Sequence, residues 1–192
     1  MHPLLLASSS PYRRELLERL GLPFECSSPD IDETRQPDEP AERLVRRLAA
    51  EKACALAHLH PNRLIIGSDQ VATLGDTVLG KPGSHQQATR QLLAASGRSV
   101  RFLTGLALLD SASGQLQVDC IPFIVHFREL STQQIERYLQ RDKPYDCAGS
   151  FKAEGLGVTL FRATEGSDAT SLIGLPLIRL TDMLIAAGIE LP

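Results

Sequence analysis

The feature that most constrains the fold is a short apolar run, residues 4–7, that meets a serine-rich turn. The turn is followed by Pro11 and by a stretch with leucines at helical spacing. Ser10 is a favourable residue at a helix N-cap, proline is favoured at the first helical position, and Gly21 is typical of a helix end. We therefore predict a buried strand that leads directly into a helix over residues 11–20.

The alternation of apolar and helical segments continues along the chain. Helical spacing of apolar residues predicts further helices at residues 41–58, 84–95, 132–140 and 177–187. Short apolar or alternating segments predict strands at residues 23–27, 64–67, 100–110, 116–127 and 157–163. Turns are expected at Gly75-Asp76 and, between two long strands, at Ser113-Gly114. This order predicts an α/β fold, a mixed sheet flanked by helices.

Composition narrows the class of protein. Of the 192 residues, 43% are hydrophobic and 22% are charged, which predicts one globular domain over residues 1–192, with two lobes and no separable linker. The net charge of -3 argues against binding to nucleic acid polymers, which usually requires excess positive charge. The four scattered cysteines form no CxxC pair, which predicts reduced thiols.

Membrane insertion and secretion are not expected. No segment approaches the roughly 20 apolar residues that a membrane-spanning helix needs. The apolar run at residues 4–7 is too short for the core of a signal peptide. We therefore expect a cytoplasmic protein without a membrane partner.

The junction between the first strand and the first helix is a candidate phosphate site. A helix N-terminus offers unpaired N–H groups and a positive dipole end. Ser8 and Ser10 add hydroxyl donors, and Arg13 can hold a phosphate with two parallel hydrogen bonds. The alternative is that Ser10 only caps the helix and that Arg13 lies on a solvated face.

Carboxylates suggest a cation site. Asp69 directly follows the apolar strand at residues 64–67, at the rim where α/β domains bind ligands. It can bind magnesium or orient an attacking water, or it can simply form a turn. An acidic loop that contains Asp30, Asp32 and Glu33 can supply a second oxygen ligand, or it can be merely solvated.

Two lysines and one glycine-bracketed segment complete the candidates. Lys81 lies between a glycine and a proline, which leaves its charge on a stiff extended turn. Lys52 lies in a predicted helix, where a lysine is usually a surface charge. Residues 147–157 place Lys152 and Glu154 among glycines that let the backbone approach a ligand. Cations for phosphates, carboxylates for a metal and a base for water suit the hydrolysis of a nucleoside triphosphate.

In these same segments the sequence resembles the Maf-like nucleotide pyrophosphatases over essentially the whole chain. Many short motifs occur in the order of that family, and together they are specific. The motifs are LLASSSPYRRELL at residues 5–17, DET at 32–34, AEKA at 50–53, GSD at 67–69, GKP at 80–82, CAG at 147–149, EGLG at 154–157 and GLPL at 174–177.

The resemblance implies a two-lobed fold like that of the inosine triphosphate pyrophosphatases, with a central cleft. It implies cleavage between the α and β phosphates and a divalent cation, Mg²⁺ or Mn²⁺. Asp69 corresponds to the proton acceptor or metal-linked base, and Glu33 to a metal partner. The phosphate contacts implied by the family are Arg13, Lys52, Lys81, Ser8 and Ser10. The resemblance is compatible with a homodimer.

Three positions resemble the branch of the family that acts on 7-methyl-GTP, namely Tyr12, Gln70 and Glu154. N7-methylation makes guanine cationic, so that the face of Tyr12 attracts it by about 0.5–2 kcal/mol. Glu154 can accept hydrogen bonds from the guanine edge. The alternative is that Tyr12 packs on its own helix and that Glu154 pairs with Lys152, which we otherwise expect among the substrate contacts.

Other functions remain open from the sequence. A pyrophosphatase of the same family with dTTP or UTP as substrate would need the same phosphate contacts. A non-catalytic nucleotide-binding regulator of cell division would also need the cations, but it would have little use for Asp69 and Glu33. A protein-interaction module would leave Lys81 and Lys152 unexplained.

Overall fold

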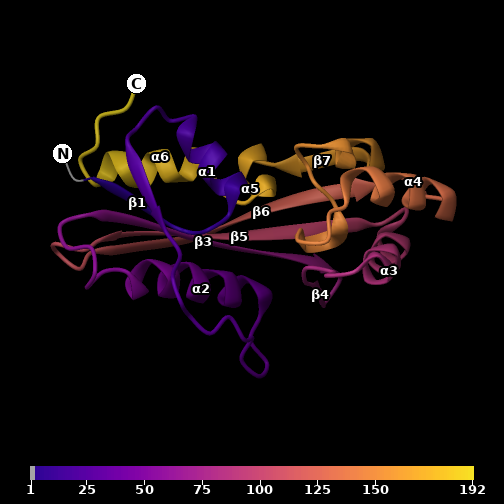
Figure 1. The fold of residues 1–192 in the computed structure, drawn as a ribbon, viewed down its shortest axis with the longest axis horizontal. Coiled ribbons are helices and arrows are strands. Elements are labelled where there is room, and N and C mark those ends of the chain that lie inside the picture. Colours follow the sequence, from indigo (N-terminus) through magenta and orange to yellow (C-terminus); the bar gives the residue numbers. More distant parts are fainter. Residues whose placement is uncertain (1–2) are drawn as a thin grey trace. The chain divides into compact units, whose positions relative to one another are not determined.

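The structure is a computed structural model that describes residues 3–192; Met1 and His2 lie outside the described residues. The chain alternates between strands and helices (Figure 1). The strands are β1 (Leu4–Ala7), β2 (Phe24–Ser27), β3 (Leu64–Leu74), β4 (Thr77–Leu79), β5 (Ser99–Asp110), β6 (Leu116–Phe127) and β7 (Phe161–Gly166). The α-helices are α1 (Pro11–Glu18), α2 (Ala41–Ala55), α3 (His85–Ala95), α4 (Thr132–Asp142), α5 (Ala169–Ile173) and α6 (Leu177–Ala186). None of the helices within residues 3–192 is long and apolar enough to span a bilayer.

The chain divides into two compact units. The first unit consists of Met1–Asp69, Thr104–Ile121 and Asp168–Pro192, and the second consists of Gln70–Leu103 and Pro122–Ser167. Strands β3, β5 and β6 each contribute residues to both units.

The strands form a single mixed sheet. Its order is β2-β1-β3-β5-β6-β7, and β4 pairs with β3 outside this path. Strand β1 runs parallel to both β2 and β3, with Leu4 opposite Phe24 and Leu64. Strand β4 is antiparallel to β3, and β7 is antiparallel to β6. The predicted α/β class with a mixed sheet is therefore confirmed.

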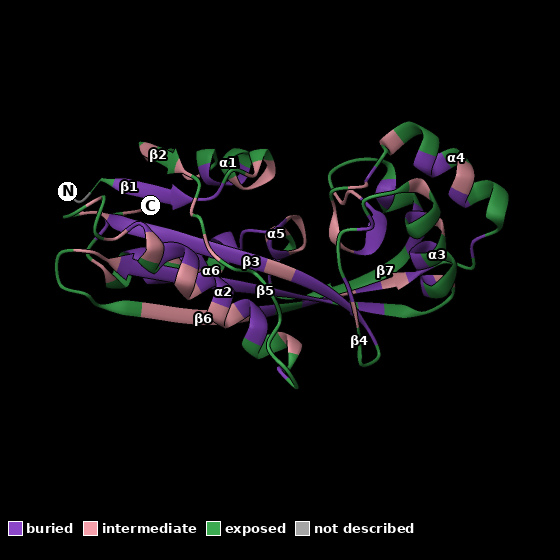
Figure 2. Cartoon of the chain, turned by 60° about the horizontal axis from the view of Figure 1, so that its bottom comes forward, coloured by how far each residue is buried: buried purple, intermediate pink, exposed green. Residues whose placement is uncertain are grey.

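In the first unit, the sheet is buried on both faces. Because successive side chains of a strand point to opposite sides, Leu4 and Leu6 of β1 enter one core, whereas Leu5 and Ala7 enter the other. Helices α1 and α6 cover the first face and α2 covers the second (Figure 1). The central strands are accordingly purple along most of this unit in Figure 2. Burial on both faces explains the uninterrupted apolar runs in the sequence.

Two glycines allow α2 to lie unusually close to the sheet. A Cβ atom at Gly67 of β3 would overlap the carbonyl oxygen of Ala49, and one at Gly105 of β5 would overlap that of Val45. Neither glycine has a positive φ, so close packing rather than backbone conformation requires them. The backbone of α2 thus rests directly on β3 and β5.

The second unit has a core of its own, centred on aromatic rings. Phe151 packs edge-on against Phe102, Phe127 and Phe161, with ring centroids 4.8–5.6 Å apart. Such edge-to-face pairs add about 0.5–1.5 kcal/mol each beyond burial. Gly149, at φ 74°, brings the chain close to Phe102, where a Cβ would lie 3.1 Å from the ring.

Most predicted elements occur within a few residues of their expected bounds, but two strand predictions were wrong. Strand β3 continues to Leu74, so that Asp69 lies within the strand and not beyond its end. Residues 156–160 form a 3₁₀ helix, and the last strand begins only at Phe161. At Gly157 the chain still folds back on itself, since a Cβ there would overlap the carbonyl oxygen of Lys152. The apolar residues of this segment therefore do not mark a strand. The short helix α5, capped by the side chain of Asp168, was not predicted.

We expect Gly67→Ala to lower the free energy of unfolding by about 1–3 kcal/mol, the usual cost of overpacking a core. The added methyl group would push α2 away from β3. Gly80→Ala is the control, because a Cβ at Gly80 meets no atom within 4 Å. Urea denaturation of both variants measures the difference, and an unchanged midpoint for Gly67→Ala would contradict the close approach.

Candidate active site

A buried lysine lies between two carboxylates in the first unit. The Nζ atom of Lys52, in the last turn of α2, is 2.7 Å from Oδ1 of Asp69 and 2.8 Å from Oε1 of Glu33. The Lys52 side chain is only 8% exposed. The sequence-based expectation of a surface charge at Lys52 was therefore wrong, and the lysine and both carboxylates come together.

The packing of α2 explains this arrangement. Gly67 and Asp69 lie two residues apart on β3 and so point to the same face of the sheet, the face that α2 covers. The close approach at Gly67 brings the end of α2 beside Asp69. A buried ammonium is costly unless it is paired, and the two carboxylates supply that pairing.

The start of α1 forms a second cluster in the same unit. The Ser10 side chain caps the helix by accepting a hydrogen bond from the backbone N–H of Arg13 at 3.5 Å. Ser8 Oγ accepts hydrogen bonds from the backbone N–H of Ser10 at 3.1 Å and from Nη1 of Arg13 at 3.4 Å. Capping of α1 by Ser10 is thus real, but Arg13 does not extend into solvent as that alternative proposed.

The guanidinium of Arg13 is held by a carbonyl group from a distant part of the chain. Its Nε donates to the carbonyl oxygen of Gly174 at 2.8 Å. The same oxygen accepts from Oγ of Ser68, which is fully buried and also donates to Gly105. Gly174 has φ 121°, a conformation that favours glycine. Sequence reasoning missed Ser68 and Gly174 as parts of the site, although both lie in the motifs quoted above.

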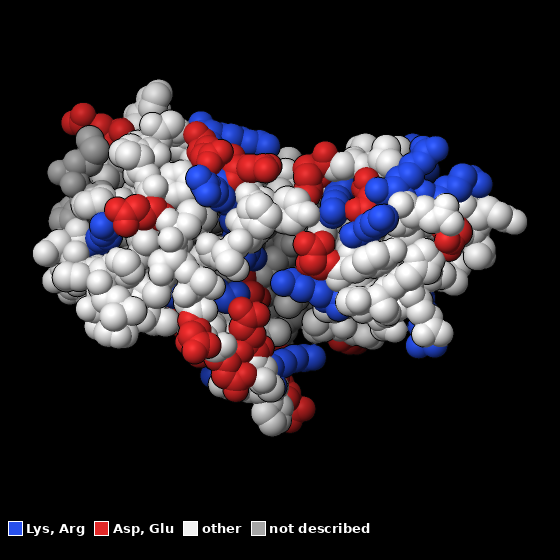
Figure 3. All heavy atoms as spheres, in the orientation of Figure 1, with Lys and Arg blue, Asp and Glu red and all other residues white. Residues whose placement is uncertain are grey.

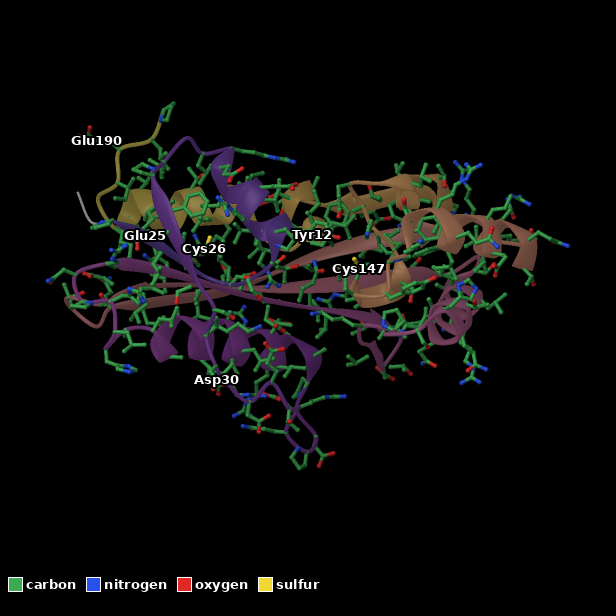
Figure 4. All side chains as sticks on the ribbon, viewed as in Figure 1. Tyr12, Glu25, Cys26, Asp30, Cys147 and Glu190 are labelled. Carbon is green, nitrogen blue, oxygen red and sulfur yellow. The ribbon has the colours of Figure 1, made fainter. Side chains whose placement is uncertain are left out.

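The lysine cluster and the arginine cluster share one electrostatic environment. Burial lowers the pKa of Arg13, and the negative charges of Asp69 and Glu33 partly oppose that effect. Two cations and two carboxylates of the first unit therefore interact before any ligand binds. Tyr12, half-buried beside Arg13 at the beginning of α1, is labelled in Figure 4.

Within the acidic loop, the three candidate carboxylates behave differently. Asp30, labelled in Figure 4, is exposed. Asp32 accepts a hydrogen bond from the backbone N–H of Thr34 at 2.9 Å, and hydrogen bonding from Thr34 holds its pKa below the usual value. This contact forms a local turn. Glu33 is the loop carboxylate that reaches Lys52.

The remaining candidates belong to the second unit. Gln70 is half-buried on β3, and Lys81 is exposed in the loop after β4. This loop is anchored on both sides of Lys81. The carbonyl oxygen of Gly80 accepts a hydrogen bond from Nε2 of Gln91 at 3.1 Å. The backbone N–H of Gly83 donates to the carbonyl oxygen of Tyr145 at 2.9 Å.

Lys152 directly precedes a short turn of the second unit, and Glu154 is an exposed residue within that turn. The backbone N–H of Lys152 donates to the hydroxyl oxygen of the buried Tyr138 at 2.9 Å, which fixes the start of the turn. Burial raises the pKa of Cys147 to about 12; the charges of Asp146 and Glu154 act in the same direction, and Lys152 opposes them. The charges of Lys152 and Glu154 therefore both act on the Cys147 thiol.

The arrangement in the first unit also bears on metal binding. No group of three or more histidine, cysteine, aspartate or glutamate side chains is placed to hold a metal ion among residues 3–192. Glu33 and Asp69 nevertheless direct oxygen atoms to one cationic point. Mg²⁺ is commonly bound by one or two carboxylates together with phosphate oxygens of a substrate. The two carboxylates fit that mode of binding.

Comparisons with known proteins identify the family of the chain. The family described as "Maf-like protein" matches residues 3–187. The chain is 68% identical to a 7-methyl-GTP pyrophosphatase of Pseudomonas fluorescens and 69% identical to one of Pseudomonas syringae pv. syringae, in each case over 100% of both chains. It is also 65% identical to a 7-methyl-GTP pyrophosphatase of Pseudomonas aeruginosa, again over 100% of both chains.

Proposed function

The chain belongs to the Maf-like protein family, and on that basis we propose that it hydrolyses 7-methyl-GTP to 7-methyl-GMP and diphosphate. The observation that carries the reaction type is the buried Lys52 between Glu33 and Asp69, next to a half-buried Arg13. Fixed charges at a protected site stabilise the charge that spreads over phosphate oxygens during phosphoryl transfer.

Each basic residue has a role in holding the triphosphate. Arg13 keeps two hydrogen bonds to the protein, which orient its guanidinium and direct the other N–H groups towards a phosphate. Ser8, Ser10 and the N-terminus of α1 add donors beside it. Lys52 and Lys81 supply further positive charge. Together these groups would offset part of the negative charge of the triphosphate.

A divalent cation, Mg²⁺ or Mn²⁺, would be held by Asp69 and Glu33 together with phosphate oxygens of the nucleotide. When bound, it neutralises negative charge on the phosphates and polarises the bond that breaks. Lys52 holds the two carboxylates close together, because its ammonium group contacts both of them.

The chemical step is an attack of water on the α phosphorus. A new bond forms between the water oxygen and the α phosphorus, and the bond from that phosphorus to the oxygen bridging to the β phosphate breaks. Diphosphate leaves with the bond electrons. Asp69 accepts the proton of the attacking water; were it only a ligand of the metal, that proton would pass to solvent.

Recognition of the base is assigned to four residues. Tyr12 offers an aromatic face to the cationic 7-methylguanine ring, and Glu154 accepts hydrogen bonds from the guanine edge. Gln70 and Lys152 contribute further polar contacts to the substrate. The names of the relatives support this choice of base over dTTP or UTP.

We further propose that both units belong to one enzymatic domain over residues 1–192, acting in the cytoplasm. The family match extends over residues of both units, from 3 to 187, which supports a single functional domain. A homodimer remains compatible with this proposal.

The test of the function is diphosphate release from 7-methyl-GTP, GTP, dTTP and UTP, each with Mg²⁺ and with a chelator. We expect 7-methyl-GTP to give the highest kcat/KM and the chelator to stop the reaction, since phosphate charge would then lack its counter-ion. A preference for dTTP or UTP would keep the enzyme class and overturn the assigned base. Absence of turnover with every nucleotide would favour the regulator of cell division.

We expect Asp69→Asn to lower kcat by about 10²–10⁴-fold, the usual contribution of a positioned acid or base. Binding of a non-hydrolysable analogue should remain measurable, because Lys52 keeps Glu33 as a partner. Single-turnover kinetics measure the first quantity and calorimetry the second. Asp76→Asn, at an exposed turn, serves as the control. A near-normal rate for Asp69→Asn would remove Asp69 from the mechanism.

We expect Glu154→Gln to lower kcat/KM for 7-methyl-GTP roughly tenfold or more, because the attraction of a carboxylate to the cationic base is lost. The unmethylated nucleotide GTP should be affected less. Glu129→Gln changes another exposed carboxylate of the second unit and is the matched control. An equal loss of activity on all nucleotides would show that Glu154 does not read the base.

A further inference from the structure

One arginine ties the acidic loop to α2. Arg47 grips Glu39 with two parallel hydrogen bonds, from Nε to Oε1 at 2.7 Å and from Nη2 to Oε2 at 2.9 Å. Nη2 also donates to the carbonyl oxygen of Thr34 at 3.1 Å, and Nη1 contacts Glu51 at 3.0 Å. This two-pronged geometry is the strongest form of an arginine–carboxylate pair.

The carboxylate at the centre of these contacts is unusual for a loop residue. The Glu39 side chain is 2% exposed, and that of Arg47 is 18% exposed. Glu39 also accepts from the backbone N–H of Gln36 at 3.1 Å, while its own carbonyl oxygen accepts from Nε of Arg35. Hydrogen bonds from Arg47 lower the pKa of Glu39 to about 2. Acidic side chains gather with basic ones around this loop (Figure 3).

The contact to Thr34 links this pair to the candidate active site. Thr34 directly follows Glu33, and its N–H is held by Asp32 while its carbonyl group is held by Arg47. The Glu33 side chain is 59% exposed, yet its carboxylate reaches Lys52 at 2.8 Å. An exposed side chain on a free loop would lose this position to conformational entropy. The anchored backbone limits that loss.

We propose that Arg47 is a positioning residue which, by clamping Glu39 and Thr34 to α2, keeps the Glu33 carboxylate beside Lys52 and Asp69 for the metal and nucleotide. Arg47 touches neither substrate nor metal in this role. The inference rests on the proposed function, because it gives Glu33 the metal-binding part assigned above. Residues that orient a ligand in this indirect way typically change metal affinity by about 10–100-fold when mutated.

The chain offers a matched control in the preceding residue. Arg46 lies on the same helix and is also ion-paired, with Glu42 and Asp119, both at 3.3 Å. It additionally donates to the carbonyl oxygen of Val118 at 3.4 Å. None of these partners belongs to the acidic loop. Arg46→Lys therefore tests the general effect of replacing a paired arginine on α2.

The experiment compares Arg47→Lys and Glu39→Gln with Arg46→Lys by two measurements. Lysine keeps the charge but cannot make the two-pronged contact. Hydrogen–deuterium exchange of residues 29–39 should become faster in the first two variants and stay near wild type in the third. The Mg²⁺ concentration for half-maximal hydrolysis of 7-methyl-GTP should rise about tenfold or more in the first two, with KM at saturating Mg²⁺ changed less than about threefold. Glu33→Gln should raise the Mg²⁺ requirement at least as much.

The outcomes separate this inference from the proposed function. If the exchange rates and the Mg²⁺ requirement change no more in Arg47→Lys and Glu39→Gln than in Arg46→Lys, the positioning role of Arg47 is overturned. That result would leave the proposed hydrolysis of 7-methyl-GTP intact. An unchanged Mg²⁺ requirement in Glu33→Gln would overturn the role of Glu33, and with it this inference, in an active enzyme. If wild-type protein hydrolyses none of the nucleotides, the proposed function and the metal part of the inference both fail. The exchange measurement still decides whether Arg47 holds the loop.

Discussion

The close contact of α2 with the sheet determines where the charged groups of the first unit lie. At Gly67 and Gly105 the helix backbone rests on the strands, with no side chain between them. This contact carries Lys52 to the level of Asp69, and both Lys52 and Arg47 of the same helix contact the acidic loop. The close packing of α2 on the two glycines therefore sets the geometry of a polar site. The charges are placed by backbone proximity, and their mutual attraction then keeps them there.

In the first unit, the positively charged side chains of the candidate site already have partners within the protein. Lys52 has two carboxylate partners, and Arg13 is fixed by a carbonyl oxygen and a serine hydroxyl. Each buried charge is thus compensated in the ligand-free protein, as burial requires. For a nucleotide pyrophosphatase this means that the groups are oriented in advance. Little of the binding energy has to be used to order them.

Sequence reasoning anticipated the alternation of strands and helices because apolar spacing and capping residues such as Ser10 are local signals. The sequence motifs predicted membership of the Maf-like family, and the match of the family to residues 3–187 confirms it. Burial of Lys52 could not be read locally, because it depends on a glycine in a distant strand. The same holds for Ser68, whose partner is the carbonyl oxygen of Gly174, 106 residues away. The 3₁₀ helix at residues 156–160 was missed because its apolar residues mimic a strand. The assigned roles of the site residues stay predictions.

The pairing of Lys52 has a consequence for turnover. An ammonium group that already has two carboxylates within 2.8 Å has partners to return to when a phosphate departs. If Lys52 contacts the phosphates as proposed, these carboxylates would compete with diphosphate for the same ammonium group. Such competition would limit how tightly the product is retained and would shorten its residence time. An enzyme with an isolated lysine at this place would hold its product more strongly and regenerate more slowly.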